Sequence, residues 1–196
     1  MMRMVNDLMT LARMDSGQAI LQFEKLDLSD VALEAVERMT GMAERQKVTL
    51  ETAELPELTV NGDRQYLVQM ISNLIENAIK YSGAGQSVKV ETSAAADGFA
   101  VLRVVDTGPG IPPEHLPHLF DRFYRVDQAR TQGDEATAPS GSGLGLSIVA
   151  WIIQAHGGKI HVESQVGQGT TIVITLPVRL PAGRLDRTAN KSDLIG

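Results

Sequence analysis

One predicted helix, residues 63–81, places the strongest constraint on how this chain folds. Its apolar side chains recur at i, i+3, i+4, i+7, i+8 and i+11 and form one continuous face: Leu67, Met70, Ile71, Leu74, Ile75 and Ala78. Such a face is stable only when other elements cover it. The chain is therefore expected to fold as a globular domain around this helix.

The other side of the same helix carries amide and cationic side chains at helical spacing: Gln69, Asn73, Asn77 and Lys80. Asparagine is disfavoured in a helix relative to alanine by roughly 0.5–0.7 kcal/mol per residue, so two of them one turn apart need a reason. One interpretation is a pair of carboxamide oxygens for Mg²⁺, with Lys80 one turn further on for a phosphate. The alternative is a solvated helix face, which more commonly carries Glu and Lys.

Periodicity along the rest of the chain predicts interleaved helices and strands. Helices are expected at 1–16, 28–46 and 143–156, and strands at 48–52, 58–60, 88–92, 99–105, 159–163 and 170–176. The last four strands form two hairpin-like pairs. We therefore expect a two-layer α/β sandwich, with a mixed, mostly antiparallel sheet and helices on one face. The apolar pattern of the first helix is already under way where the helix begins. This helix is therefore either the end of a larger element or an ordinary helix packed on the domain.

Composition excludes several classes of function. The chain has no cysteine, which rules out a disulfide scaffold, a thiolate metal site and a cysteine nucleophile. Its 18 basic and 24 acidic residues give a net charge of −6 with no long basic cluster, so nucleic acid is not an expected partner. No apolar run approaches the ~20 residues that span a bilayer. A small anionic ligand stays compatible with this charge, because backbone amides also bind anions.

Glycine is concentrated in one part of the chain. Ten of the 18 glycines lie between Gly108 and Gly169, and glycine lets the main chain turn sharply or approach a ligand closely. Asp106 ends a predicted strand and is followed by Gly108 and Gly110. One interpretation is a carboxylate that accepts a hydrogen bond from an exocyclic amine, beside glycines that admit a flat ring. The other is a tight turn capped by its own aspartate.

A second glycine loop, residues 141–146, leads into the predicted helix at 143–156. Free amides at a helix N-terminus make a phosphate site. Neither standard phosphate motif fits: a P-loop requires Gly-Lys-Ser/Thr, and a dinucleotide fold requires a strand where residues 131–140 show no strand pattern. A flexible glycine-rich loop is the alternative. The short run 167–169 is by itself only a turn.

Taken together, and in their order along the chain, these segments resemble the sequence boxes of the sensor histidine kinase family. Residues 73–82 (NLIENAIKYS) resemble the N box, 106–111 the G1 box, 120–125 (FDRFYR) the F box, 141–149 the G2 box and 167–171 the G3 motif. The resemblance covers about residues 27–177. It implies a Bergerat-type fold, ATP and Mg²⁺ as ligands, and transfer of the γ-phosphoryl group to a histidine.

The resemblance also implies where each part of Mg·ATP binds. Asn77 would hold Mg²⁺ with help from Asn73, and Lys80 and Arg125 would meet the phosphates. The complete expected ATP site is Asn73, Asn77, Lys80, Tyr81, Asp106, Gly108, Gly110, Ile111, Arg125, Gly141, Gly143, Leu144, Gly145, Leu146 and Thr170.

The nucleoside end of the expected site is formed by the first and last glycine motifs. By resemblance, Asp106 would bind the adenine amine, Thr170 would assist through water, and Tyr81 would flank the nucleoside. Residues 112–140 would form a lid over ATP. The two histidines in that lid, His115 and His118, have no evident third ligand and are expected to be exposed to solvent rather than to bind a metal.

The sequence departs from the family pattern at the phosphoacceptor. The family's acceptor is a His followed by Glu or Asp and then Arg-Thr-Pro or similar, and none of the four histidines here has that context. We expect the acceptor to lie outside this chain, on the dimerisation domain whose second helix residues 5–17 resemble. The expected domains are that helix end (1–17), a catalytic ATP-binding domain (18–180) and a flexible tail (181–196).

These expectations extend to the cellular context. A response regulator is the expected partner of the full-length protein, which we expect to be anchored in a membrane with this part on the cytoplasmic side. The fragment itself is expected to be soluble and mostly monomeric, because its dimerising helices are truncated.

Two other functions share parts of this pattern. ATPases of the gyrase, mismatch-repair and heat-shock chaperone kind resemble the chain in the N box, but they place a Glu where Asn73 stands. An amide cannot accept a proton from water, so hydrolysis by general base catalysis is disfavoured. A non-catalytic nucleotide-binding module is the remaining alternative.

Overall fold

The computed structural model describes residues 2–53, 55–95, 98–126 and 142–178. Its helices are α1 (Met2–Asp15), α2 (Leu28–Gln46), α3 (Arg64–Ser82) and α4 (Gly145–Ala155), with a short 3₁₀ helix, η2 (Pro113–His118). Its strands are β1 (Glu24–Asp27), β2 (Thr49–Thr52), β3 (Thr59–Gly62), β4 (Ser87–Ala95), β5 (Phe99–Asp106), β6 (Lys159–Gln165) and β7 (Gly169–Pro177). No helix in these ranges has both the length and the apolar character needed to cross a membrane.

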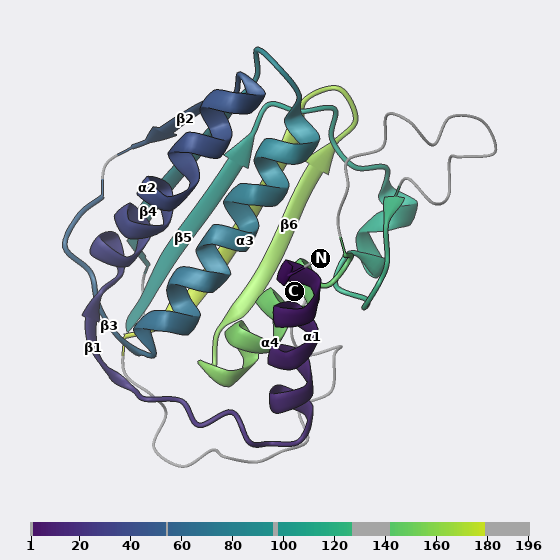
Figure 1. The fold of residues 1–196 in the computed structure, drawn as a ribbon. Helices are drawn as coiled ribbons and strands as arrows, with labels where there is room; N and C mark the ends of the chain where they lie inside the picture. Colours follow the sequence, from purple (N-terminus) through teal and green to yellow (C-terminus); the bar gives the residue numbers. More distant parts are fainter. Residues whose placement is uncertain (1, 54, 96–97, 127–141, 179–196) are drawn as a thin grey trace.

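Five strands form the main sheet in the order β2-β4-β5-β7-β6, in which only the β2–β4 pair is parallel. The separate pair of β1 and β3 is antiparallel. Figure 1 shows α2 and α3 lying side by side across one face of the sheet. The predicted two-layer α/β sandwich with a mixed, mostly antiparallel sheet is thereby confirmed.

The core lies between the helices and the inner face of the sheet. The apolar face predicted for residues 63–81 is buried: Leu67, Met70, Ile71, Leu74 and Ile75 have no exposed surface, and Ala78 is 7% exposed. It meets the alternate apolar residues of β4, β5, β7 and β6, among them Leu102, Ile174 and Ile160. The alternation predicted for these strands reflects a sheet that is covered on one face.

The predicted elements differ from the structure in a few places. The strand β1 and the helix η2 were not predicted, because both are short and neither has a full period of apolar residues. Helix α4 begins at Gly145 rather than at residue 143. Gly143 has a positive φ of 69°, which is incompatible with a right-handed helix.

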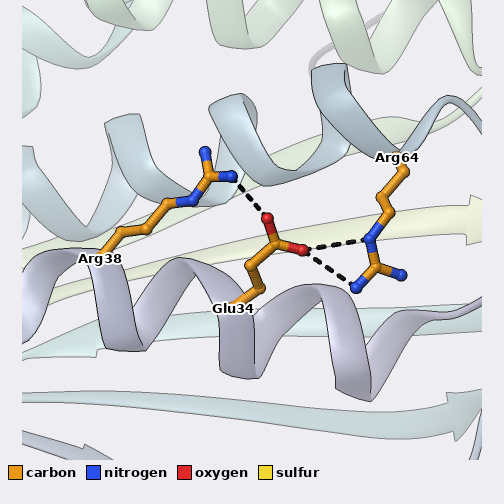
Figure 2. Close-up of polar contacts among 3 residues, drawn as sticks. All are labelled: Glu34, Arg38 and Arg64. Carbon is orange, nitrogen blue, oxygen red and sulfur yellow. Dashed lines mark hydrogen bonds and ion pairs between the residues drawn. The ribbon is translucent and has the colours of Figure 1, made fainter.

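The ends of α2 and α3 follow ordinary capping chemistry. Asp27 accepts a hydrogen bond from the Ser29 amide at 2.9 Å, which makes it the cap of α2. Asp63 caps α3 in the same way by accepting from the Tyr66 amide. A surface cluster also joins the two helices (Figure 2). Glu34 of α2 pairs with Arg38 of the same helix at 2.5 Å and with Arg64 of α3 at 2.9 Å. Exposed pairs of this kind contribute only about 0.2–1 kcal/mol each.

Helix α1 contacts α4. Leu11 and Met14 of α1 are each 5% exposed and join the core, whereas Leu8 and Met9 remain exposed. The described part of this helix therefore packs on the domain through one side.

A buried histidine joins α4 to the start of α3. His156 is 1% exposed, and its Nε2 accepts a hydrogen bond from the Asp63 amide at 3.0 Å. Its Nδ1 lies 2.7 Å from the Ile152 carbonyl, to which it donates. These two bonds define a neutral ring with its proton on Nδ1. Burial lowers the pKa of His156, against the smaller opposing effects of the Ile152 carbonyl and the Asp63 carboxylate.

We therefore expect the protein to lose stability as the pH falls below about 6.5, the ordinary pKa of histidine. The unfolded chain binds a proton at His156 more readily than the folded chain does, so acid favours unfolding. Urea unfolding at pH 7.5 and pH 5.5 measures the effect. His156→Gln should remove part of the pH dependence, and the exposed control His161→Gln should retain it. Equal pH dependence in both variants would contradict the assignment.

Candidate functional site

The polar side of α3 faces the N-terminus of α4. Asn73 is 9% exposed, and its Nδ2 lies 3.4 Å from the Gly145 carbonyl oxygen, to which it donates. A Cβ placed on Gly145 would lie 3.9 Å from Asn77 Nδ2 and 4.0 Å from Asn73 Cγ. The two amides therefore lie against the first residue of α4, with Asn77 half-buried. A larger residue at position 145 would occupy the space in front of them.

The first turn of α4 has no side-chain cap. The loop that precedes α4 is held by Phe123, whose amide donates to the Gly143 carbonyl at 2.9 Å. A Cβ on Gly143 would lie 2.8 Å from Phe123 Cα, so this approach requires glycine. The positive end of the α4 dipole is thus directed toward the Asn73–Asn77 side of α3, an arrangement that suits an anion or a metal–phosphate group.

Lys80 lies one turn beyond Asn77 and forms an ion pair with Glu76 at 2.5 Å. The Glu76 side chain is only 4% exposed, whereas that of Lys80 is 20% exposed. The ammonium group therefore pairs with the carboxylate of the residue that precedes Asn77 in the helix. Tyr81, the next residue, is 41% exposed.

A row of polar residues crosses the inner face of the sheet at the end of β5, near the end of β6 and at the start of β7. Asp106 of β5 is paired with Thr170 of β7, and Thr170 is paired with Ser164 of β6. Side chains at directly paired positions lie on the same face and within contact distance. Each of these residues occupies the position where the next core residue of its strand would stand, so the row marks the place where the core gives way to a polar site.

The Asp106 carboxylate is held by main-chain donors. Its Oδ1 accepts from the Gly108 amide at 2.9 Å, and the carboxylate also accepts from the Thr170 amide. Burial raises the pKa of Asp106, and these two hydrogen bonds only partly oppose that rise. A Cβ on Gly108 would lie 2.8 Å from Ser82 Cα at the end of α3. The loop that follows Asp106 therefore packs directly against the end of α3, the helix that carries Asn73 and Asn77.

The loops after β5 and β6 interlock through glycine. A Cβ on Gly110, where φ is +70°, would collide with the Gln165 carbonyl oxygen, and one on Gly169, where φ is +109°, would collide with that of Asp106. The Gly167 amide donates to the Pro109 carbonyl at 2.8 Å. The two glycine motifs thus form one unit around Asp106.

The segment that follows Gly110 contributes both polar and apolar groups. Leu119 and Phe120 are buried, whereas Phe123 is 57% exposed. His115 Nδ1 lies 2.7 Å from the Tyr124 hydroxyl. His118 pairs with Asp121 at 3.0 Å.

Most of the predicted site residues occur in two groups joined by α3. Asn73, Asn77 and Gly145 meet at one group, with Leu144 buried and Leu146 half-buried beside Gly145. Asp106, Gly108, Gly110, Ile111 and Thr170 meet at the other, where the Ile111 amide donates to Ser164. Arg125 is half-buried. Gly141 and residues 127–140 of the predicted lid lie outside the described residues.

Two features of the site were not predicted. Ser164 contacts Ile111, Gly169 and Thr170, and the signal that could have found it is a serine at the inward position after Ile160 and Val162. The burial of Glu76 has no such signal, since it depends on the helices packed around α3.

Residues 62–180 match the model of a protein family described as histidine kinase-, DNA gyrase B- and HSP90-like ATPase. The sensor protein SrrB of Staphylococcus aureus is 35% identical over 175 residues, which is 89% of this chain and 29% of SrrB. The chain thus spans less than a third of the length of the curated relatives it matches.

Solved structures resemble this one over most of its length. The structure of full-length ShkA in complex with AMPPNP has a TM-score of 0.77 at 29% identity and covers 89% of this chain and 35% of ShkA. The mycobacterial sensor histidine kinase MprB has a TM-score of 0.66 at 32% identity, over 80% of this chain and 97% of the MprB chain.

Proposed function

Because this chain belongs to the family of histidine kinase-, DNA gyrase B- and HSP90-like ATPases, we propose that it is the catalytic ATP-binding domain of a sensor histidine kinase. It transfers the γ-phosphoryl group of Mg·ATP to a histidine on another domain. The observation that carries this proposal is the pair of amides, Asn73 and Asn77, placed against the N-terminus of α4 without a carboxylate at position 73.

The donor groups fit Mg²⁺ and triphosphate. Asn77, helped by Asn73, would supply neutral oxygens to Mg²⁺, and the bound cation would neutralise phosphate charge. The first amides of α4 bind phosphate oxygens, because they have no partner within the helix. We also assign Lys80 and Arg125 to the phosphates, and Gly145 leaves the space that a side chain would fill.

The other group of residues fits the nucleoside. Asp106 accepts a hydrogen bond from the adenine amine, with Thr170 beside it, and Tyr81 flanks the sugar and base. Gly108, Gly110 and Ile111 bring the main chain close to the ring. Gly143, Leu144 and Leu146 shape the loop and first turn at the phosphate end, and the resemblance adds Gly141 to the proposed site.

The charges around the amides favour phosphoryl transfer over hydrolysis. Asn73 has no basic site that could remove a proton from water. The buried carboxylate one turn away, Glu76, forms an ion pair with Lys80 at 2.5 Å, so its charge already has a cationic partner. Phosphoryl transfer needs mainly positioning and charge stabilisation, and this arrangement provides both.

The proposal includes partners beyond this chain. Residues 1–17 form the end of a dimerisation helix, 18–180 the catalytic domain, and 181–196 a tail. The dimerisation domain presents the acceptor histidine and a response regulator receives the phosphoryl group. The full-length protein is anchored in a membrane with this domain on its cytoplasmic side.

A phosphotransfer assay tests the proposal. The chain alone, mixed with radiolabelled ATP and Mg²⁺, is expected to bind ATP, to label itself little and to hydrolyse ATP slowly. Adding a separate dimerisation domain that carries an acceptor histidine should give label on that domain that is labile to acid and stable to base. Transfer should be weak, because the tether that raises the local concentration is missing.

Three outcomes would contradict the proposal. Acid-labile label on the chain alone would mean that one of its own histidines is an acceptor. Rapid release of phosphate would favour the hydrolytic ATPases, and ATP binding without either reaction would favour a nucleotide-binding module.

A further inference from the structure

Ser164 of β6 connects the loop after β5 to the start of β7, beside Asp106. Its Oγ accepts a hydrogen bond from the Ile111 amide at 2.8 Å and donates to the Gly169 carbonyl at 3.0 Å. The same Oγ lies 2.9 Å from the Thr170 hydroxyl. Thr170 is 7% exposed and is paired across the sheet with both Asp106 and Ser164.

The protons and lone pairs of the Ser164 hydroxyl determine which atom donates in each contact. A serine hydroxyl has one proton and two lone pairs. The Gly169 carbonyl takes the proton, and the Ile111 amide fills one lone pair. The remaining lone pair can only accept, so the Thr170 hydroxyl donates to Ser164. Thr170 Oγ1 is then left with lone pairs and no proton for a ligand.

We propose that Ser164 is a positioning residue for nucleotide selectivity, which holds the Thr170 hydroxyl as a hydrogen-bond acceptor beside the Asp106 carboxylate. This inference rests on the proposed function. Two adjacent acceptors favour a ligand edge that carries donor protons, as the 6-amino group of adenine does. A 6-carbonyl group would meet two acceptors and lose the hydrogen bonds on that edge.

Replacing Ser164 should therefore change selectivity more than affinity. Without the serine oxygen, the Thr170 hydroxyl can turn its proton toward the ligand and donate to a carbonyl. Calorimetric titrations with ATP and with ITP, which has a carbonyl in place of the amine, should show that S164A lowers the ATP-to-ITP affinity ratio about five- to tenfold.

Matched variants separate this role from a structural one. S164T retains a hydroxyl and should keep the wild-type ratio. S93A removes a serine hydroxyl from β4, where Ser93 accepts from Arg103, and should also leave the ratio unchanged. T170V should lower the ratio, and S164A should have no further effect on it in that background, because both act through one hydroxyl. If S164A melts below the assay temperature, S164C retains the size of the side chain with weaker hydrogen bonds.

The possible results are distinct. Equal losses of ATP and ITP affinity in S164A, or an unchanged ratio, would overturn the inference and leave the proposed function standing. An unchanged ratio in T170V would overturn it too. Failure of the wild-type protein to bind either nucleotide would instead overturn the proposed function, and this inference with it.

Discussion

Asp106→Asn is expected to weaken ATP binding about ten- to a hundredfold while raising the melting temperature of the nucleotide-free protein. The loss of affinity corresponds to a hydrogen bond to a charged group, worth about 1.5–3 kcal/mol. The affinity for GTP should fall less, because the amide of asparagine can donate to the carbonyl of guanine. Discrimination between ATP and GTP should therefore be reduced, and calorimetric titration with each nucleotide measures this.

The gain in stability follows from the raised pKa of Asp106. Because burial disfavours the carboxylate, the contribution of this group to stability is largest at low pH and is lost as the pH rises through its folded pKa. Asparagine carries no charge and can still accept from the Gly108 amide. Each 1 kcal/mol by which the substitution reduces the cost of burying this charge would raise the melting temperature by about 2–4 °C in a protein of this size.

Two controls make this prediction specific. The difference in melting temperature between D106N and the wild type should shrink as the pH is lowered, since Asp106 becomes neutral in the wild type. The exposed Asp30 lies in the first turn of α2, so Asp30→Asn should leave nucleotide affinity unchanged and should not raise the melting temperature. A lower melting temperature for D106N at neutral pH would show that the carboxylate stabilises the fold.

Asn77→Ala is expected to lower the affinity for Mg·ATP about ten- to a hundredfold and the affinity for metal-free ATP much less. The lost oxygen faces the cation in the proposed site, and the expected loss is that of a contact to a charged group, about 1.5–3 kcal/mol. Titrations with Mg²⁺ and with a chelator present measure the two affinities. Alanine is also the better helix former by roughly 0.5–0.7 kcal/mol, so the variant should fold.

Gln69→Ala is the matched control for Asn77→Ala. It removes an amide from the same side of α3, one turn before Asn73, and Gln69 is half-buried as Asn77 is. It should leave both affinities unchanged. Parallel loss of Mg·ATP and metal-free ATP binding in N77A, or unfolding of that variant, would assign Asn77 a structural role instead.

The helices and strands were largely predictable because their signals are local. The apolar face of residues 63–81 and the alternation in β4, β5, β6 and β7 arise from side-chain period alone. The predicted bounds 28–46 are those of α2. Helix α4 starts later than predicted because the conformation of Gly143 depends on Phe123, which packs against it from another part of the chain.

The candidate site was predictable to the extent that its residues stand in recognisable runs. Asp106, Gly108 and Gly110 belong to one such run, and Asn73 and Asn77 to another. Ser164 belongs to none, and its role depends on two strand pairings that place it next to Thr170 and near Asp106.

The sequence by itself determined the fold class, the resemblance to sensor histidine kinases and the identity of the chemical groups at the site. Only the tertiary structure decided the electrostatic state of particular groups, at the site and in the core: that Glu76 is buried with Lys80, that burial raises the pKa of Asp106, and that the core residue His156 is neutral and accepts a hydrogen bond from the Asp63 amide. The reason is physical. Period and residue type act over a few neighbouring residues, whereas burial and hydrogen bonding depend on groups such as Asp63 and His156, 93 positions apart in the chain.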